Sequence, residues 1–502
     1  SFDENYEELN WNFHKQLVID LKNKFIHGEE FNKKKFDEEV KGFVGYGIGF
    51  QIVSQPIQNF LQDILAQDNK TSLYGAKLLS KHFVVFLFFF ISGIFFYLIL
   101  RKIVENEDFR ILALIIYLTY PYLFGQSMFS PKDVPFLSVW VVCTFLSFNL
   151  IEKIIDKKKI NIKSVLIFSL VTSYLLSIRI AGILIFLQYF FLLALYFSIY
   201  KENMIQFFKI FYLKITTFFF GIVILTFLLN PIFLIDPSLI VTTIKINANH
   251  FNNVGTTTFG KIMYARDLPS TYIPIWMAVK IPIIIILGIL LLPFTEKRIF
   301  QNKKNATFFG TLLLTIISIP LILILNKVHL YDEIRQIMFL IPIIFIIGLI
   351  SLFTFSKSIF YTLGIISIIF FVIENIKINP YQYVWFNLPS RYIDLTNKFE
   401  LEYQGISGKE IAKRILKNSD QNICILANPI HVIKPFLHNT NFNCFDIWQK
   451  VDTNFERPFL AVQNVRNLKK SLPYKCKVID ETGFKLIFHK KKFVTGKLLK
   501  CE

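Results

Sequence analysis

Residues 83–100 read FVVFLFFFISGIFFYLIL, a stretch of eighteen residues without a charged side chain. Because about 20 apolar residues in a helix cross a hydrocarbon core of roughly 30 Å, this stretch predicts a transmembrane span. Similar runs give about ten expected spans in all, at residues 78–100, 109–126, 134–151, 163–179, 181–200, 207–229, 274–293, 307–326, 336–355 and 357–374. The sequence therefore predicts an all-α polytopic membrane bundle. It excludes a soluble globular enzyme, a fibrous protein and a disordered chain.

The composition agrees with a membrane protein. Of 502 residues, 53% are hydrophobic and 18% are charged, whereas about a quarter are charged in soluble proteins. Lys+Arg number 55 against 36 Asp+Glu, which gives a net charge of +19. Lys, Ile, Asn and Phe are all frequent, as in proteins from AT-rich genomes, so this charge does not predict a nucleic-acid partner.

The regions on either side of the spans differ in pattern. Residues 1–77 are polar to amphipathic, with an apolar residue at every fourth position from Leu9 to Phe25 and a second short helix expected at 56–66; both helices suit a membrane interface. Residues 78–374 form the transmembrane core. Residues 375–502 predict a small α/β domain, with strands expected at 423–426, 459–462, 477–479 and 484–488 and a helix at 409–416.

The loop charges predict an orientation. One set of alternate loops carries fifteen basic residues and the other carries seven, and basic loops stay in the cytoplasm. We therefore expect a multi-pass protein of the bacterial inner membrane. The N-terminal loop, the 230–273 loop and the C-terminal domain would face the periplasm.

Several charged groups stand in the loops expected outside. Asp3 and Glu4 could supply a general base and its neighbour, or form a solvated acidic turn. Lys132 and Asp133 lie between two prolines at a span end, where ionisable groups are often functional; a tight hairpin with a snorkelling lysine is the alternative. Arg179, between two spans, must reach the headgroups or pair with an anion.

The later outer loops add four candidates for substrate binding, His250, Tyr264, Asp332 and Arg335. His250 and Tyr264 lie in the 230–273 loop, where a structural His and an interfacial aromatic belt are the alternatives. Arg335 follows Asp332 and Glu333, and it could bind a phosphate or simply pair with one of these carboxylates. All the candidates fall on one predicted face of the membrane.

The sequence contains no metal-ligand spacing, P-loop or dinucleotide-binding pattern, so no residue is assigned to a metal. A divalent cation is left open. Cys143 falls in an apolar run, and we expect it to be a small residue of the core. The other four cysteines lie in the tail, where pairing is possible but not deducible, at 424, 444, 476 and 501.

Three of these features together resemble the GT-C class of membrane glycosyltransferases: Asp3-Glu4, the Pro131–Pro135 hairpin, and Asp332-x-x-Arg335 before a late span. The class includes protein O-mannosyltransferases and lipid A aminoarabinose transferases. Three further segments resemble an uncharacterised bacterial branch of it, at 260–276 (Leu-Pro…Tyr-x-Pro-x-Trp), 379–387 (NPYQYVWFN) and 399–403 (FELEY).

The resemblance implies a helical bundle with interfacial helices in the first outer loop and a polyprenyl-phosphate-linked sugar as donor. A lipid, glycan or protein hydroxyl would be the acceptor. Asp3 would act as the base, Lys132 and Arg335 would hold the lipid phosphate, and the transfer would invert the anomeric carbon. The sequence departs from the pattern of this class at two places. Gln336 stands where the branch has His, and a span that normally precedes the acidic pair is expected to be missing.

Two other functions were weighed. A transporter or flippase would show repeats and polar residues in the middle of the membrane, and a non-catalytic sensor would leave the acidic first loop unexplained. Convergence of Asp3, Lys132, Asp133 and Arg335 on one cavity would favour the enzyme, whereas scatter would favour the alternatives.

Overall fold

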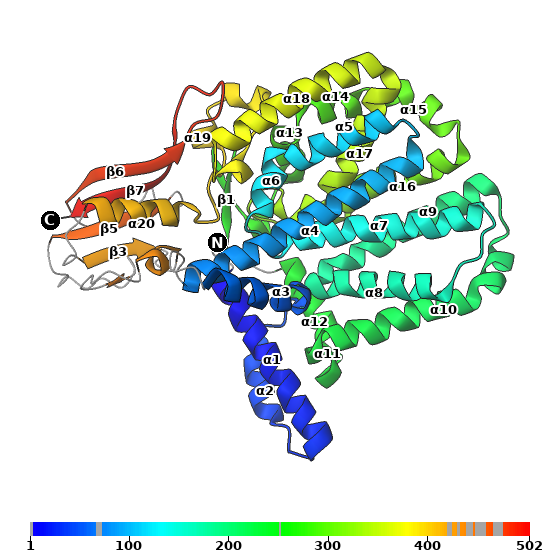
Figure 1. Cartoon of the computed structure of the whole chain (residues 1–502), viewed down its shortest axis with the longest axis horizontal. Coiled ribbons are helices and arrows are strands. Elements are labelled where there is room, and N and C mark those ends of the chain that lie inside the picture. Colours follow the sequence, from blue (N-terminus) through cyan, green and yellow to red (C-terminus); the bar gives the residue numbers. More distant parts are fainter. Residues whose placement is uncertain are drawn as a thin grey trace.

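The computed structural model describes residues 4–66, 73–249, 253–418, 424–428, 432–437, 445–446, 458–464 and 475–501. A helical bundle takes up most of the molecule, and a small sheet domain at the C-terminal end of the chain lies beside one end of it (Figure 1). The predicted membrane bundle with a C-terminal α/β domain is thus confirmed.

Three helices precede the bundle: α1 (Glu4–His27), α2 (Lys33–Glu39) and α3 (Gly49–Ala66). α1 and α2 project from it as a hairpin (Figure 1). A four-residue repeat drifts around a helix that has 3.6 residues per turn. Leu17 is therefore buried, whereas Leu9 and Phe25 at the two ends of the repeat are exposed.

The bundle helices follow in chain order. They are α4 (Leu73–Ile103), α5 (Glu107–Thr119), α6 (Pro121–Ser127), α7 (Asp133–Ile155), α8 (Ile162–Ile178), α9 (Ile185–Tyr200), α10 (Met204–Leu229), α11 (Pro231–Ile235), α12 (Leu239–Asn249), α13 (Tyr272–Lys280), α14 (Ile283–Leu290), α15 (Leu292–Phe300), α16 (Lys303–Leu325), α17 (Ile341–Phe355) and α18 (Lys357–Lys377). A hairpin of β1 (Gly255–Thr258) and β2 (Lys261–Tyr264) separates α12 from α13.

Fewer single helices than the expected ten are long enough to cross a membrane. Among the described residues seven qualify, or eight if the bent pair α13–α14 is one span; α8 is a shorter apolar helix. A continuous span at 109–126 is wrong, because α5 has 13 residues and ends just before Pro121. Proline has no N–H to continue the helix and disfavours helical geometry in the residue before it.

The two ends of the bundle differ in chemistry. The connections α4–α5, α7–α8, α9–α10, α15–α16 and α17–α18 lie at the right-hand end in Figure 1. These connections and the helix ends that they join carry the fifteen basic residues counted above; we call this the basic end. Asparagine side chains there accept hydrogen bonds from first-turn N–H groups and cap helices, at Asn106, Asn161, Asn203 and Asn302.

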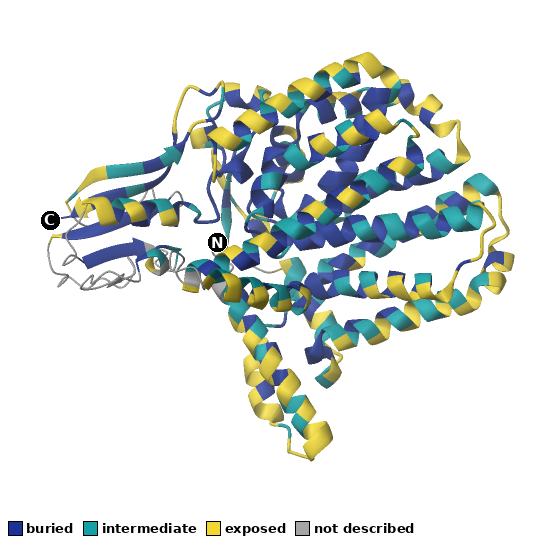
Figure 2. Cartoon of the chain, in the orientation of Figure 1, coloured by how far each residue is buried: buried dark blue, intermediate teal, exposed yellow. Residues whose placement is uncertain are grey.

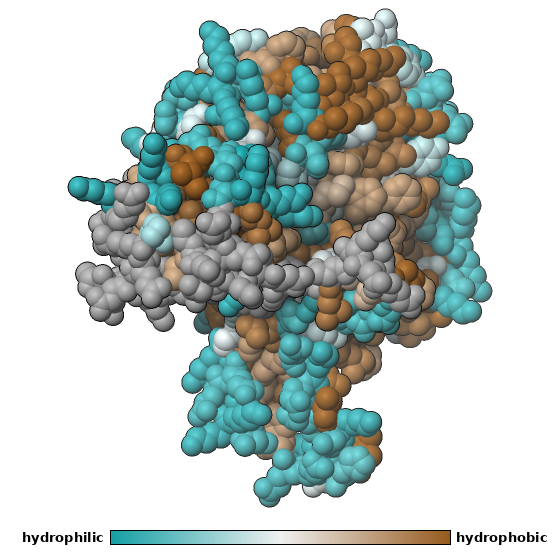
Figure 3. Space-filling view, turned by 60° about the vertical axis from the view of Figure 1, so that its left-hand side comes forward, coloured by the Kyte–Doolittle hydropathy of each residue, from teal (hydrophilic) through white to brown (hydrophobic). Residues whose placement is uncertain are grey.

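Burial separates central from peripheral helices (Figure 2). In α17 and the 3-10 turn before it, 94% of the apolar window is buried, against 11% in α10. α14 crosses α17 so closely that a Cβ on Gly288 would lie 1.8 Å from the Gly348 carbonyl oxygen, as small residues allow in membrane bundles. Hydrophobic residues cover the side of the bundle, and the α1–α2 hairpin below is largely hydrophilic (Figure 3).

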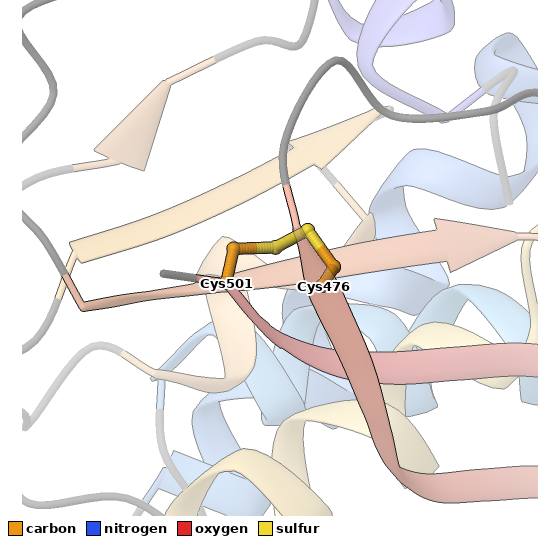
Figure 4. The surroundings of a disulfide bond; sticks show 2 residues. All are labelled: Cys476 and Cys501. Carbon is orange, nitrogen blue, oxygen red and sulfur yellow. A yellow bond between two sulfur atoms is a disulfide. The ribbon is translucent and has the colours of Figure 1, made fainter.

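The C-terminal domain has one sheet, in the strand order β4-β3-β5-β7-β6. Its strands are β3 (Cys424–Asn428), β4 (Phe445–Asp446), β5 (Phe459–Asn464), β6 (Cys476–Phe484) and β7 (Phe493–Cys501), and α20 (Ser407–Asn418) packs on the sheet through Ile411, Ala412 and Ile415. The strand expected at 484–488 is wrong, because β6 ends at Phe484. A disulfide joins Cys476 to Cys501 across β6 and β7 (Figure 4).

Candidate active site

Asp133 is the first residue of α7, at the bundle end opposite the basic end. A carboxylate is favoured there by the partial positive charge of a helix N-terminus. Arg179 forms a close ion pair with Asp133 Oδ1. Arg335 approaches Oδ2 at 3.4 Å, and the Ser130 hydroxyl donates to the same oxygen at 3.2 Å. Of the two possibilities for Arg179, pairing with an anion is the one realised.

Lys132 has a partner that the sequence did not single out. Its ammonium lies 2.9 Å from Glu7 Oε1 on α1 and 4.3 Å from the ring centroid of Tyr46. Glu7 is buried and accepts a hydrogen bond from Gln51 on α3 at 3.3 Å. The available signal was the pair of carboxylates in NYEELN, residues 5–10, which stands at the start of the helix expected in the first outer loop.

One cavity of about 320 Å³ is lined by Lys132, Asp133, Arg179 and Arg335; its volume is at the lower end of the range for small-molecule sites. We call this bundle end the cavity end. Its lining comprises Tyr6, Gly45, Tyr46, Gly47, Lys132, Asp133, Ile178, Arg179, Ile246, Asn247, His329, Tyr331, Arg335 and Gln336. A Cβ on Gly47 would lie 2.2 Å from the Ser177 carbonyl oxygen, so only glycine lets this loop approach the end of α8.

Two carboxylates face Arg335, those of Asp133 and Asp332. Its Nη2 lies 3.7 Å from Asp332 Oδ2 and its Nε lies 3.4 Å from Asp133, whereas charge-assisted hydrogen bonds are about 2.7–2.9 Å long. Arg335 lines the cavity, where the planar fork of its guanidinium could bind two oxygens of a phosphate.

A buried ion pair holds the loop that carries Arg335. Lys280, at the break between α13 and α14, lies 2.9 Å from Glu333, and both side chains have no exposed surface. Asp332 and Glu333 have positive φ values of 55° and 66°, and the Asp332 N–H donates to Thr256 at 3.0 Å. Burial raises the pKa of Glu333, whereas the charge of Lys280 beside it acts to lower that pKa. The sequence signal was a lysine inside the expected span 274–293.

The three segments that resemble the bacterial branch pack together through aromatic side chains. The ring of Trp276 lies 6.2 Å from Phe386 and 5.0 Å from Phe399. Lys280 lies 4.2 Å from the centroid of Phe386. Trp276 and Phe386 therefore pack against the ammonium of Lys280.

The remaining predicted residues lie elsewhere. Asp3 and His250 are outside the described residues, and only the backbone of Glu4 is described. Tyr264 lies on β2, half-exposed and beside Arg266, and does not line the cavity. Within the described ranges, no group of three or more His, Cys, Asp or Glu could hold a metal ion.

Comparison with solved structures finds ArnT from Cupriavidus metallidurans, in the apo state and bound to undecaprenyl phosphate. The TM-scores are 0.44 and 0.43 at 10% identity, and each comparison covers 89% of this chain and 87% of the ArnT chain. ArnT is a GT-C lipid A aminoarabinose transferase, the class that the sequence motifs resemble. No family model and no curated protein matches the sequence.

Proposed function

We propose that this protein transfers a sugar from a polyprenyl-phosphate-linked donor to an acceptor hydroxyl on the extracytoplasmic side of the membrane. The observation that carries the proposal is the convergence of Lys132, Arg179 and Arg335 on one cavity at the cavity end. A sugar on a lipid phosphate brings its own leaving group, so the protein needs fixed cations and a base rather than a nucleotide-binding fold.

The chemistry is a single displacement at the anomeric carbon. The acceptor hydroxyl gives its proton to the Asp3 carboxylate, and its oxygen attacks the anomeric carbon. The bond from that carbon to the phosphate oxygen breaks, and polyprenyl phosphate leaves with the electron pair. Lys132 and Arg335 stabilise the charge that develops on the leaving phosphate, and the anomeric configuration inverts.

Two features support the extracytoplasmic side. The basic residues gather at the opposite end of the bundle, and basic loops face the cytoplasm. The Cys476–Cys501 disulfide lies in the domain beside the cavity end, and disulfides persist in oxidising compartments such as the periplasm.

Transport of a lipid-linked or anionic substrate is the second candidate. The observation that favours it is the 117° bend between α13 and α14, because many transporters bind substrates at broken helices. The polar groups at this break, however, are sealed in the Lys280–Glu333 pair.

One assay separates these functions. Full-length protein in proteoliposomes receives a panel of undecaprenyl-phosphate sugars and an extract of native membrane acceptors, with and without EDTA. We expect one donor to release undecaprenyl phosphate and to give a glycosylated product of inverted configuration. Movement of a donor between leaflets without bond cleavage would replace the transferase with the transporter.

A further inference from the structure

The turn between β6 and β7, residues 485–492 (KLIFHKKK), is fixed to the last turn of α18. Glu374 of α18 accepts hydrogen bonds from the Ile487 N–H at 2.9 Å and from Arg391 at 2.8 Å. Arg391 also donates to the Ile487 carbonyl at 2.8 Å. The side chains of Glu374 and Arg391 are completely buried, so the position of the turn is set by a sealed ion pair.

This attachment defines the depth of the turn in the membrane. α18 is long and apolar enough to be a span, and Ile373 and Ile376 near its end are 42% and 75% exposed. Exposed isoleucines on a spanning helix face hydrocarbon, and the helix ends at Lys377 one residue later. The turn that binds Glu374 therefore lies where the hydrocarbon meets the headgroups.

The surface of the turn is basic around one exposed aromatic residue. Four lysines line a hollow of about 830 Å³, at positions 377, 485, 490 and 492. The described ion pairs include none for these four, whereas Lys491 lies 3.7 Å from Asp394. Phe488 lies among them, 66% exposed, with a φ of 60°.

We propose that Lys377 and residues 485–492 bind the phosphate headgroups of anionic phospholipids in the adjoining leaflet. Each lysine near an anionic membrane surface strengthens the attraction about fivefold. Lysine stems can lie along hydrocarbon while their ammonium groups reach the phosphates. The ring of Phe488 can pack against the acyl chain of a lipid, which strengthens binding, whereas a free phosphate ion has no apolar part for it to contact. The lipid headgroup is therefore the favoured ligand. The surface would orient the C-terminal domain on the membrane independently of the proposed transfer reaction.

The test uses purified full-length protein in three media: nanodiscs containing phosphatidylglycerol, nanodiscs of phosphatidylcholine alone, and the latter with added inorganic phosphate. Hydrogen exchange of the 485–492 amides is the local readout. We expect slower exchange only with phosphatidylglycerol, and less slowing at high salt. Equal exchange with both lipids would overturn the proposal. Slowing by inorganic phosphate to the same extent would assign the surface to free phosphate instead.

Matched variants show whether the charges act at this place. K485Q/K490Q/K492Q should lose roughly 100-fold in affinity for short-chain phosphatidylglycerol, about fivefold per lysine. The control K409Q/K413Q/K417Q removes three exposed lysines from α20 of the same domain and should keep the affinity. Phe488→Ser should weaken lipid binding and leave phosphate binding unchanged. If both triple variants lost the same affinity for phosphatidylglycerol, the binding would depend on net charge and not on the lysines of residues 485–492.

Discussion

Helix α7 carries one carboxylate near each end, and each lies between two cations. At the cavity end Asp133 pairs with Arg179 and Arg335. At the basic end Glu152 pairs with Lys102 and Lys304. Each group joins one carboxylate to two cations. The group at Asp133 lines a cavity and its cations are planar guanidinium groups, whereas the cations around Glu152 at the basic end are ammonium groups.

This difference indicates two uses of charge in one membrane protein. A guanidinium offers a fixed fork that can bind two oxygens of a phosphate, whereas an ammonium is a point charge that mainly neutralises. The cavity end is thus suited to recognition, and the basic end to orientation in the membrane. The following experiments test that division, from the largest expected effect to the smallest.

Reporter fusions should give an all-or-none difference between the two ends. A fusion after residue 380 should be active only as a periplasmic reporter, and a fusion after Lys157 in the α7–α8 loop only as a cytoplasmic one. Cytoplasmic activity of the 380 fusion would invert the topology and move every proposed site residue to the other side.

Asp3→Asn should lower turnover by 10²–10⁴, about 3 to 5.5 kcal/mol of barrier, because the amide cannot accept the acceptor proton. Steady-state kinetics on the full chain measures this, with donor binding as a separate readout. Glu7→Gln is the comparison, and it should raise KM for the donor more than it lowers kcat, since Glu7 positions Lys132. Near-normal turnover of Asp3→Asn would move the base to another carboxylate, with Asp133 next to test.

Lys280→Met should destabilise the fold by about 3–5 kcal/mol, because it leaves the Glu333 carboxylate buried without a partner. Thermal unfolding in detergent measures the loss. The double variant Lys280→Met/Glu333→Gln removes both charges and should recover most of the stability. If the double variant were as unstable as the single one, the pair would contribute through packing rather than charge.

Arg335→Lys should weaken donor binding roughly tenfold to a hundredfold, since one ammonium replaces a fork whose charged hydrogen bonds contribute about 1.5–3 kcal/mol. Direct binding of undecaprenyl phosphate measures the change. Lys304→Arg makes the reverse exchange at the basic end and should leave binding unaltered. Unchanged affinity in Arg335→Lys would remove the phosphate role of Arg335.

Glu152→Gln should have the smallest effect on function, because its pairs with Lys102 and Lys304 lie at the basic end and not at the cavity. Its turnover should match that of the unaltered protein. A loss of activity would mean that the basic end takes part in catalysis and would break the division between the two ends.

Much of the bundle could be predicted from the sequence, because hydrophobic runs of span length have few structural alternatives in a membrane. The exceptions are at prolines. Pro121 begins a new helix inside the span expected at 109–126, and Pro282 lies in the break between α13 and α14 inside 274–293. In the C-terminal domain the sequence did not predict β7, because FVTGKLLKC mixes lysines with apolar residues. This segment becomes a strand by pairing with β5 and β6, and residues 493–501 alone do not reveal that pairing.

The sequence by itself determined that Lys132, Asp133, Arg179 and Arg335 stand at span ends, because a chain this apolar places its few charges where they can reach water or a partner. Only the tertiary structure decided the partners: Glu7 for Lys132, Asp133 for both arginines, and Glu333 for Lys280. The physical reason is that a position at a span end follows from the apolar run beside it in the chain. An ion pair between distant residues depends on how whole helices cross.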